Sequence, residues 1–167
     1  MKTATRVEEK LRKIREHQDK NGYPVHVIPL AEALGLNVYF VDWDDSMSGK
    51  IERDGERAGP SGYAIYVNKN HHPNRRRFTI AHEIAHFVLH QEEIGDGVFD
   101  DAMYRSGLPQ RAEFEANRLA ADILMPWHLL NQAMATPDYT VASLADHFQV
   151  SKSAMSIRLG VPYETVG

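Results

Sequence analysis

Two histidines and a glutamate share one predicted helix, in the stretch His82-Glu83-Ile84-Ala85-His86. Histidines four residues apart lie about 40° apart around an α-helix and about 6 Å apart along it, so both imidazoles can reach one ion. The intervening Glu83 lies near the same rim, where it can accept a proton from water. The stretch predicts a zinc peptidase site with His82 and His86 as ligands and Glu83 as general base. The alternative is two histidines on a half-buried helix beside a solvated glutamate.

A second predicted helix supplies a third candidate ligand, Glu113. On a helical wheel, Glu113 lies within about 80° of the residues that form the apolar side, and these are Ala116, Asn117, Ala120, Ile123 and Leu124. An unpaired carboxylate is very costly to bury, so Glu113 needs a partner such as a metal ion held by two imidazoles. Asn117 lies one turn further on the same face and is a candidate hydrogen-bond partner for a ligand, with a core amide as the alternative.

Other side chains are candidates for supporting roles. His90 lies on the same side of its helix as His82 but about 12 Å away, so we expect it to pack or hydrogen-bond behind the ligands. No residue is a certain oxyanion stabiliser, and the candidates for that role in the substrate cleft are Tyr63, Tyr104 and His90. Glu115 falls on the polar side of its helix, where we expect a solvated ion pair.

The elements that must position these residues follow from the apolar periodicity. It predicts strands over residues 37–41, 46–53 and 62–68, and helices over 5–19, 29–34, 74–89 and 109–125, with two short helices within 141–160. Residues 91–108 are rich in acids and glycine, and we expect them to form a functional loop. The order predicts an α+β fold in which a small N-terminal sheet precedes the helices.

Composition narrows the class of protein. The chain has 167 residues, 43% hydrophobic and 25% charged, which indicates one soluble globular domain rather than a disordered or fibrous chain. It has no run of apolar residues long enough for a transmembrane helix and no recognisable targeting segment. The absence of cysteine excludes disulfides and thiolate chemistry, and we expect a cytoplasmic protein. A net charge of −4 gives no overall attraction to nucleic acid or to an anionic membrane.

Two separate stretches resemble the signature of the ImmA/IrrE family of metallopeptidases. They are RFTIAHEIAHFVLH at residues 77–90 and EFEANRLAADILMP at residues 113–126, in the same order as in the family. Weaker similarity upstream extends the resemblance over residues 24–160. It implies a single domain over residues 1–167, with a zincin-like minimal metallopeptidase core at 1–135, two ligand-bearing helices, and a helix-turn-helix-like helical hairpin at 136–167.

The resemblance also implies an activity. Carried over by position, His82, His86 and Glu113 would bind Zn²⁺, with Mn²⁺ as an alternative, and Glu83 would be the general base. The strand over residues 62–68 would border the cleft and pair with an extended peptide. The implied substrate is a helix-turn-helix repressor of phage, mobile-element or stress-response genes, whose cleavage relieves repression.

Two other functions stay open. Residues 143–159 resemble a helix-turn-helix, but its second helix offers only Lys152 and Arg158 as cations, which does not favour DNA binding. A hairpin that packs on the domain or docks a partner is the alternative. Arg75-Arg76-Arg77 could guide an acidic substrate, or simply be solvated. The second function is a non-catalytic regulator that retains the fold, although such a protein would not need Glu83.

Overall fold

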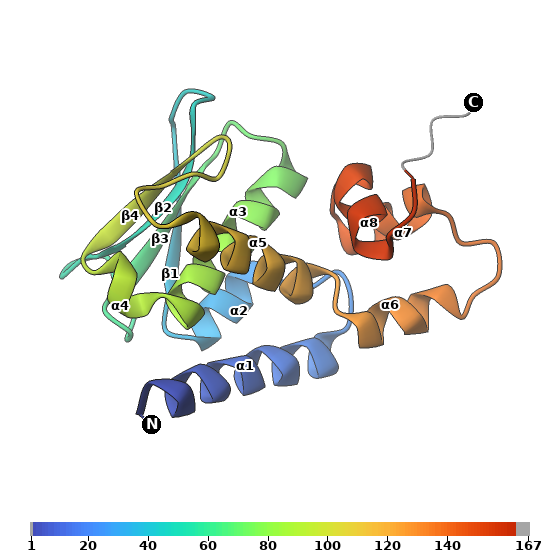
Figure 1. The fold of residues 1–167 in the computed structure, drawn as a ribbon, viewed down its shortest axis with the longest axis horizontal. Helices are drawn as coiled ribbons and strands as arrows, with labels where there is room; N and C mark the ends of the chain where they lie inside the picture. Colours follow the sequence, from blue (N-terminus) through green and yellow to red (C-terminus); the bar gives the residue numbers. More distant parts are fainter. Residues whose placement is uncertain (1, 163–167) are drawn as a thin grey trace.

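A mixed sheet of four strands forms one side of the molecule. The computed structural model describes residues 2–162, with side chains from residue 6 onward. The strands are β1 (Asn37–Val41), β2 (Met47–Arg53), β3 (Tyr63–Asn68) and β4 (Gly97–Asp101), in the order β1-β3-β2-β4 (Figure 1). β1 runs parallel to β3, whereas β2 is antiparallel to both β3 and β4. Together with the helices, this sheet confirms the predicted α+β class.

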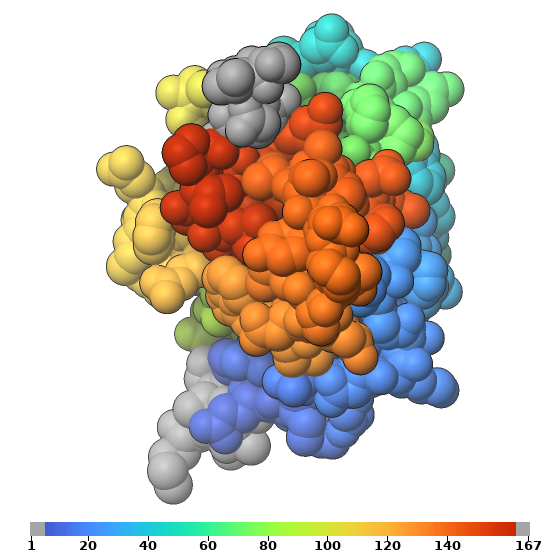
Figure 2. Space-filling model, turned by 90° about the vertical axis from the view of Figure 1, so that its right-hand side faces the viewer, coloured from blue at the N-terminus to red at the C-terminus, as the bar shows by residue number. Residues whose placement is uncertain are grey.

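The described chain also contains eight helices. They are α1 (Lys2–Asn21), α2 (Val27–Ala33), α3 (Pro73–Leu89), α4 (Gln91–Ile94), α5 (Gln110–Leu124), α6 (Trp127–Met134), α7 (Val141–Phe148) and α8 (Lys152–Leu159). In Figure 1, α2, α3 and α5 lie on one side of the sheet, and α6 to α8 lie beyond the far end of α5. The helices α6 to α8 dominate the face that Figure 2 presents. Among the described residues, no helix has the length and apolar character needed to cross a bilayer.

Helix α3 is the central element, and its position depends on one glycine. Its residues Ile80 and Ile84 are almost fully buried, and each such side chain contributes about 1.5–3 kcal/mol. A Cβ at Gly49 of β2 would lie 2.6 Å from Cγ2 of Thr79 and 3.0 Å from the carbonyl oxygen of Tyr66. Only glycine therefore lets β2 pass this close to α3, which brings the sheet next to Glu83.

The expectation of a loop over residues 91–108 was wrong. The segment contains α4 and β4, and β4 pairs with β2 in antiparallel register. Its sequence, Gly97-Val98-Phe99-Asp100-Asp101, holds residues that are uncommon in strands. Pairing with a distant strand outweighs this local preference. The segment consequently places a carboxylate, Asp100, inside the protein.

The strand expected to receive a peptide is also not available. β3 lies in the interior of the sheet and pairs with β1 on one side and β2 on the other, so it has no free edge. Within the described residues β4 pairs with β2 alone. The free edge next to α3 therefore belongs to β4 rather than to β3.

The C-terminal helices are tied to the rest of the fold by side chains that reach backbone carbonyls. The guanidinium of Arg77 donates to the carbonyls of Phe148 and Gln149 at the end of α7, and its burial lowers the pKa of Arg77 to about 10. Arg158 donates to the carbonyl of Met125 at 2.9 Å. Because cations favour the C-terminal end of a helix, Arg77 both anchors and stabilises α7.

The basic cluster and the predicted helix boundaries need two corrections. Arg75 and Arg76, like Arg77, donate to backbone carbonyls, those of Ala102 and Lys69, so the cluster is structural rather than merely solvated.

Helix α6 was not predicted, because Pro126 indicated only an end, whereas it also precedes a new helix. The proposed division at residues 135/136 stays a prediction, and residues 163–167 of its second part lie outside the described residues.

Candidate metal centre

Two helices bring the predicted ligands together. His82 and His86 lie on α3, both fully buried, and Glu113 lies in the first turn of α5. One carboxylate oxygen of Glu113 is 3.1 Å from Nε2 of His86, and the other is 3.4 Å from Nε2 of His82. The acid that the helical wheel placed on an apolar face thus lies against both imidazoles.

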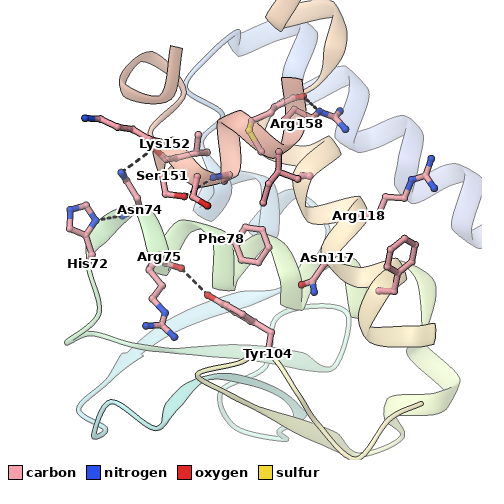
Figure 3. A pocket seen from close by; sticks show the side chains of 17 residues that line it. His72, Asn74, Arg75, Phe78, Tyr104, Asn117, Arg118, Ser151, Lys152 and Arg158 are labelled. Carbon is pink, nitrogen blue, oxygen red and sulfur yellow. Dashed lines mark hydrogen bonds between the residues drawn. The ribbon is translucent and has the colours of Figure 1, made fainter. Parts of the chain in front are cut away.

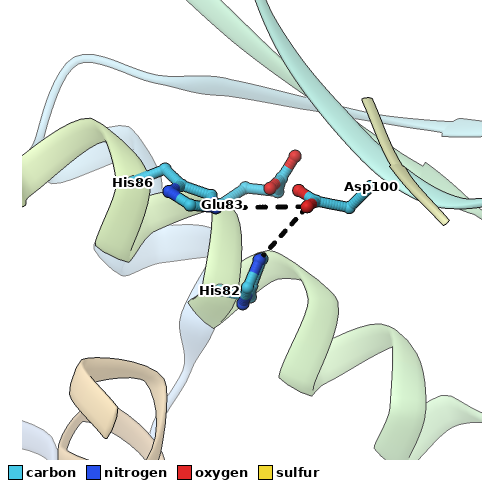
Figure 4. Close-up of side chains that lie close together, drawn as sticks. All are labelled: His82, Glu83, His86 and Asp100. Atoms are coloured by element: carbon cyan, nitrogen blue, oxygen red, sulfur yellow. Dashed lines mark ion pairs between the residues drawn. The ribbon is translucent and has the colours of Figure 1, made fainter. Parts of the chain in front are cut away.

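Two further carboxylates face the same point. Glu83 and Asp100 are fully buried, and the side chain of Asp100 extends from β4 toward the histidines of α3 (Figure 4). Oδ1 of Asp100 is 3.4 Å from Nε2 of His82 and 4.0 Å from Nε2 of His86. Potential ligand atoms of His82, Glu83, His86 and Asp100 all lie within 4.8 Å of one another. Asp100 was missed from the sequence because its strand was taken for a loop.

Seven polar atoms of this cluster have no hydrogen-bond partner within the described part of the chain. The unpaired buried atoms are Nε2 of His82 and of His86, both carboxylate oxygens of Glu83 and of Asp100, and Oε2 of Glu113. Their close approaches lack hydrogen-bond geometry, and buried polar atoms without partners are costly and rare. Two imidazoles with carboxylates form a donor set that suits Zn²⁺ or Mn²⁺. The residues therefore fit a divalent cation.

The electrostatics of the cluster also favour positive charge. Burial raises the pKa of Glu83 well above its ordinary value, and the charges of Asp100 and Glu113 act in the same direction. Burial alone would lower the pKa of His82, but the carboxylates of Asp100 and Glu113 outweigh it and raise the pKa to about 9. The same contacts with His82 and His86 outweigh burial at Glu113 and hold its pKa far below the usual range. The acids thus stabilise a cation at the point where they meet.

Asn117 orients one of the imidazoles. Its Oδ1 lies 2.8 Å from Nδ1 of His82, where it can accept the ring N–H. This contact leaves Nε2 of His82 free to face the carboxylates, as in metal sites whose histidines donate from the second nitrogen. The geometry is the one expected for Asn117 from its position on α5.

His90 stands behind the second imidazole. Its Nδ1 lies 3.1 Å from Nδ1 of His86, and its Nε2 lies 3.0 Å from Oε1 of Glu115. Glu115 also accepts a hydrogen bond of 2.6 Å from Arg111. His90 is therefore away from the ligand cluster and orients His86, while Glu115 is part of a chain of contacts to the surface rather than a simple solvated ion pair.

The two tyrosine candidates lie in different places. The hydroxyl of Tyr63 donates to the carbonyl of Gly95 at 2.7 Å, and its ring packs on Phe87, so the structure does not bring Tyr63 to the cluster. The ring of Tyr104 lies 5.1 Å from that of His82, and its hydroxyl is 2.8 Å from Oγ1 of Thr79. Tyr104 and the neighbouring Ser106, which donates to Glu113 at 2.8 Å, cover the cluster from the segment that follows β4.

Known proteins share both the sequence pattern and the fold. The chain is 33% identical over 95 residues to the radiation response metalloprotease IrrE of Deinococcus deserti, a match spanning 55% of this chain and 34% of that protein. It is 34% identical over 98 residues to the protein of the same name from Deinococcus radiodurans, spanning 57% of this chain and 30% of that one. The matches thus span about a third of the length of these curated relatives.

A solved structure and a family comparison extend the match over most of the chain. A Mycobacterium tuberculosis transcriptional regulator superposes with a TM-score of 0.55 at 18% identity, covering 91% of this chain and 46% of that one, which indicates a common fold. Residues 31–160 match the Peptidase_M78 family, described as the IrrE N-terminal-like domain. The matched range contains the whole buried cluster, and the chain belongs to the Peptidase_M78 family.

Proposed function

We propose that the chain is a zinc-dependent endopeptidase with a zincin-like site, which hydrolyses peptide bonds within a protein substrate. The observation that carries this proposal is the convergence of unpaired buried imidazole nitrogens and carboxylate oxygens, with Glu83 among them. Membership of the family and the metalloprotease relatives support the same activity. Manganese is the alternative metal, because two histidines and a carboxylate accept both ions.

Each residue of the cluster has a distinct part in the proposed reaction. His82, His86 and Glu113 would hold the zinc, which when bound polarises the scissile carbonyl and lowers the pKa of water toward neutrality. Glu83 accepts a proton from the attacking water and returns it to the leaving amine. Burial and the nearby Asp100 and Glu113 raise the pKa of Glu83 above its ordinary value. Asn117 and His90 hold the two imidazoles in orientation.

The substrate backbone would pair with the sheet beside this cluster. An extended peptide can add to an exposed strand through main-chain hydrogen bonds. Among the described strands next to the cluster, β4 has the free edge and also carries Asp100. Tyr104, which follows β4 and contacts His82, is then the remaining candidate to stabilise developing charge on the scissile carbonyl.

We further propose a helix-turn-helix repressor as the substrate, so that cleavage relieves repression of phage, mobile-element or stress-response genes. The support is the resemblance of residues 77–90 and 113–126 to ImmA/IrrE proteins. The radiation response named in the curated relatives agrees with a stress role. A structural neighbour called a transcriptional regulator is compatible with it.

The test combines metal analysis with a cleavage assay. The zinc-loaded protein is incubated with the repressor encoded beside its gene, and the products are identified by mass spectrometry. We expect Glu83→Gln to retain zinc and to lose cleavage by about 10²–10⁴-fold, the usual contribution of a general base. Cleavage by this variant at the wild-type rate would refute the assignment.

A non-catalytic regulator is the second candidate, and the enclosure of the cluster favours it. His82, Glu83 and Asp100 have no exposed surface, so a substrate must first displace the covering segment with Tyr104 and Ser106. Such a protein would bind zinc and the repressor without cleaving it, and Glu83→Gln would leave that binding unchanged.

A further inference from the structure

A large cavity opens beside the metal centre, between the first turns of α3, the outer face of α5, and α8 (Figure 3). We call it the α3/α5/α8 groove. Its volume is about 1330 Å³, whereas sites for small molecules usually occupy about 300–1,000 Å³. The groove is therefore large enough for a segment of a polymer.

Apolar side chains line much of the groove. Phe78 lies at its centre in Figure 3, and Met125 also lines the groove. Phe114 of α5 and Ile157 of α8 also line the groove, although 65% and 78% of their surfaces are exposed. Exposed large apolar side chains gathered around one hollow are typical of a surface that binds a partner.

The charges of the groove are of one sign. Its lining residues include Arg75, Arg118, Lys152 and Arg158 but no aspartate or glutamate, although the chain as a whole has a net charge of −4. Arg158 pairs with Asp122 at 2.8 Å. Within the described part of the chain, no acidic side chain pairs with Arg118 or Lys152. The groove is thus complementary to a ligand that combines apolar groups with negative charge.

The groove borders the metal centre, although none of the cluster residues lines it. Three of its lining residues, Phe78, Tyr104 and Asn117, also contact His82. A chain bound along the groove therefore lies beside the cluster, and displacement of the segment with Tyr104 and Ser106 would bring the two together. The second described cavity, on the α1 side, is lined by His90, which contacts His86, but its volume is only about 310 Å³.

We propose that the α3/α5/α8 groove binds a segment of the polypeptide substrate that carries apolar side chains interspersed with acidic ones. This inference rests on the proposed peptidase function and names the substrate feature that its site selects. Helix α8 then recognises the substrate, and the bound segment positions the adjoining peptide at the metal centre.

Duplex DNA fits the same surface less well. A helix-turn-helix reads bases with the N-terminal residues of its second helix, which here would be Lys152 and Ser153. Both residues line the groove, together with residues of α3 and α5. Phosphate contacts dominate affinity for DNA, whereas the groove contains more apolar than cationic side chains. A peptide with both apolar and acidic side chains can contact the apolar lining residues and also pair with the cationic ones.

The test measures peptide binding in the non-cleaving Glu83→Gln protein by fluorescence anisotropy. The probes are a short labelled peptide with leucine and phenylalanine interspersed with glutamate, a matched peptide with lysine in place of glutamate, and a labelled DNA duplex. We expect the acidic peptide to bind at least about tenfold more tightly than either other probe. Adding Arg118→Glu and Lys152→Glu should weaken its binding by about tenfold or more, and Ile157→Ser should also weaken it.

The matched control reverses two exposed cations of α1, Lys13→Glu and Lys20→Glu, with the same change in net charge; its affinity should stay at the starting value. Three outcomes would each overturn the inference. They are equal binding of the acidic and basic peptides, unchanged binding by the groove variants, and preferential binding of the duplex. Repressor cleavage that is unaffected by the groove substitutions would overturn the inference and leave the peptidase function standing. Peptide binding that depends on the groove, without cleavage by zinc-loaded wild-type protein, would support the groove and contradict the peptidase function.

Discussion

The metal centre and the α3/α5/α8 groove share Phe78, Tyr104 and Asn117, yet they handle charge in opposite ways. At the metal centre, Glu83 and Asp100 are fully buried, and their carboxylate oxygens make no hydrogen bond to the described chain. In the groove, Arg118 and Lys152 are solvent-exposed cations beside apolar side chains. A buried charge is stable only with a counter-ion bound next to it. An exposed charge is screened by water and salt, so it changes only the attraction of the surface for charged ligands.

Because of this difference, substitutions at the metal centre and in the groove should have effects of different size. Removing one partner from a buried charged cluster leaves the others uncompensated, so we expect large losses at the metal centre. Reversing an exposed charge changes attraction by a modest amount that depends on salt. Losses at the metal centre should therefore exceed those at the groove.

Removing the metal should destabilise the whole protein. Zinc present at a thousandfold excess over its dissociation constant contributes about 4 kcal/mol, which corresponds to about 10 °C in melting temperature for a chain of this size. We expect a chelator to lower the melting temperature by that amount, and His86→Ala to abolish the response to zinc. His128→Ala, at a histidine paired with Asp19 outside the cluster, should keep it. Identical calorimetric traces with and without zinc would contradict the presence of a metal site.

Glu113 and Asp100 should differ as ligands. Glu113 approaches both imidazoles, at 3.1 and 3.4 Å, whereas Asp100 approaches them at 3.4 and 4.0 Å. We therefore expect Glu113→Gln to weaken zinc binding by more than about a hundredfold and Asp100→Asn by about tenfold to a hundredfold. Titration against a chromophoric chelator measures both. The reverse ranking would make Asp100 the third ligand.

Asn117 belongs to both regions, and its loss should affect the metal centre. Asn117→Ala removes the acceptor for Nδ1 of His82, and we expect zinc affinity to fall by about tenfold. Asn117→Asp preserves the acceptor and should retain affinity in the same chelator titration. If both variants bind zinc like the wild type, Asn117 does not orient His82.

A loss of stability alone, without loss of zinc affinity, is expected where Arg77 anchors α7. Arg77→Met removes the two hydrogen bonds to the end of α7, and hydrogen bonds to charged groups contribute about 1.5–3 kcal/mol. We expect the free energy of unfolding, measured in urea, to decrease by at least about 1.5–3 kcal/mol, the contribution of one such bond. The control Arg12→Ala breaks an exposed pair with Glu16 and should cost less than about 1 kcal/mol. A similar loss in both variants would show that α7 is not held by Arg77.

Part of the candidate site could be predicted from local patterns. The four-residue spacing of His82 and His86 brings them to one helix face wherever that helix lies. The apolar surroundings of Glu113 on its own helix indicated that this acid is buried. The structure places all three together because α3 and α5 pack along these faces.

Asp100, α6 and the environment of Tyr63 could not be predicted in the same way. Asp100 is buried because β4 pairs with β2, a strand about fifty residues earlier in the chain. Tyr63 belongs to a strand that was predicted, but the partner of its hydroxyl, Gly95, comes from a distant segment. Such contacts depend on which distant segments pack together. The periodicity of apolar residues within one short segment does not predict this packing.

By itself, the amino-acid sequence determined which residues share a helix face and therefore that two imidazoles, the glutamate between them and a second acid can face one point. Helical geometry is set by neighbouring backbone hydrogen bonds, so residue spacing alone reveals it. Only the tertiary structure decided that Asp100 joins this cluster, that the free edge belongs to β4, and that a cationic, apolar groove opens beside it. These features arise between segments far apart in the chain, whose pairing depends on packing and burial rather than on local propensity.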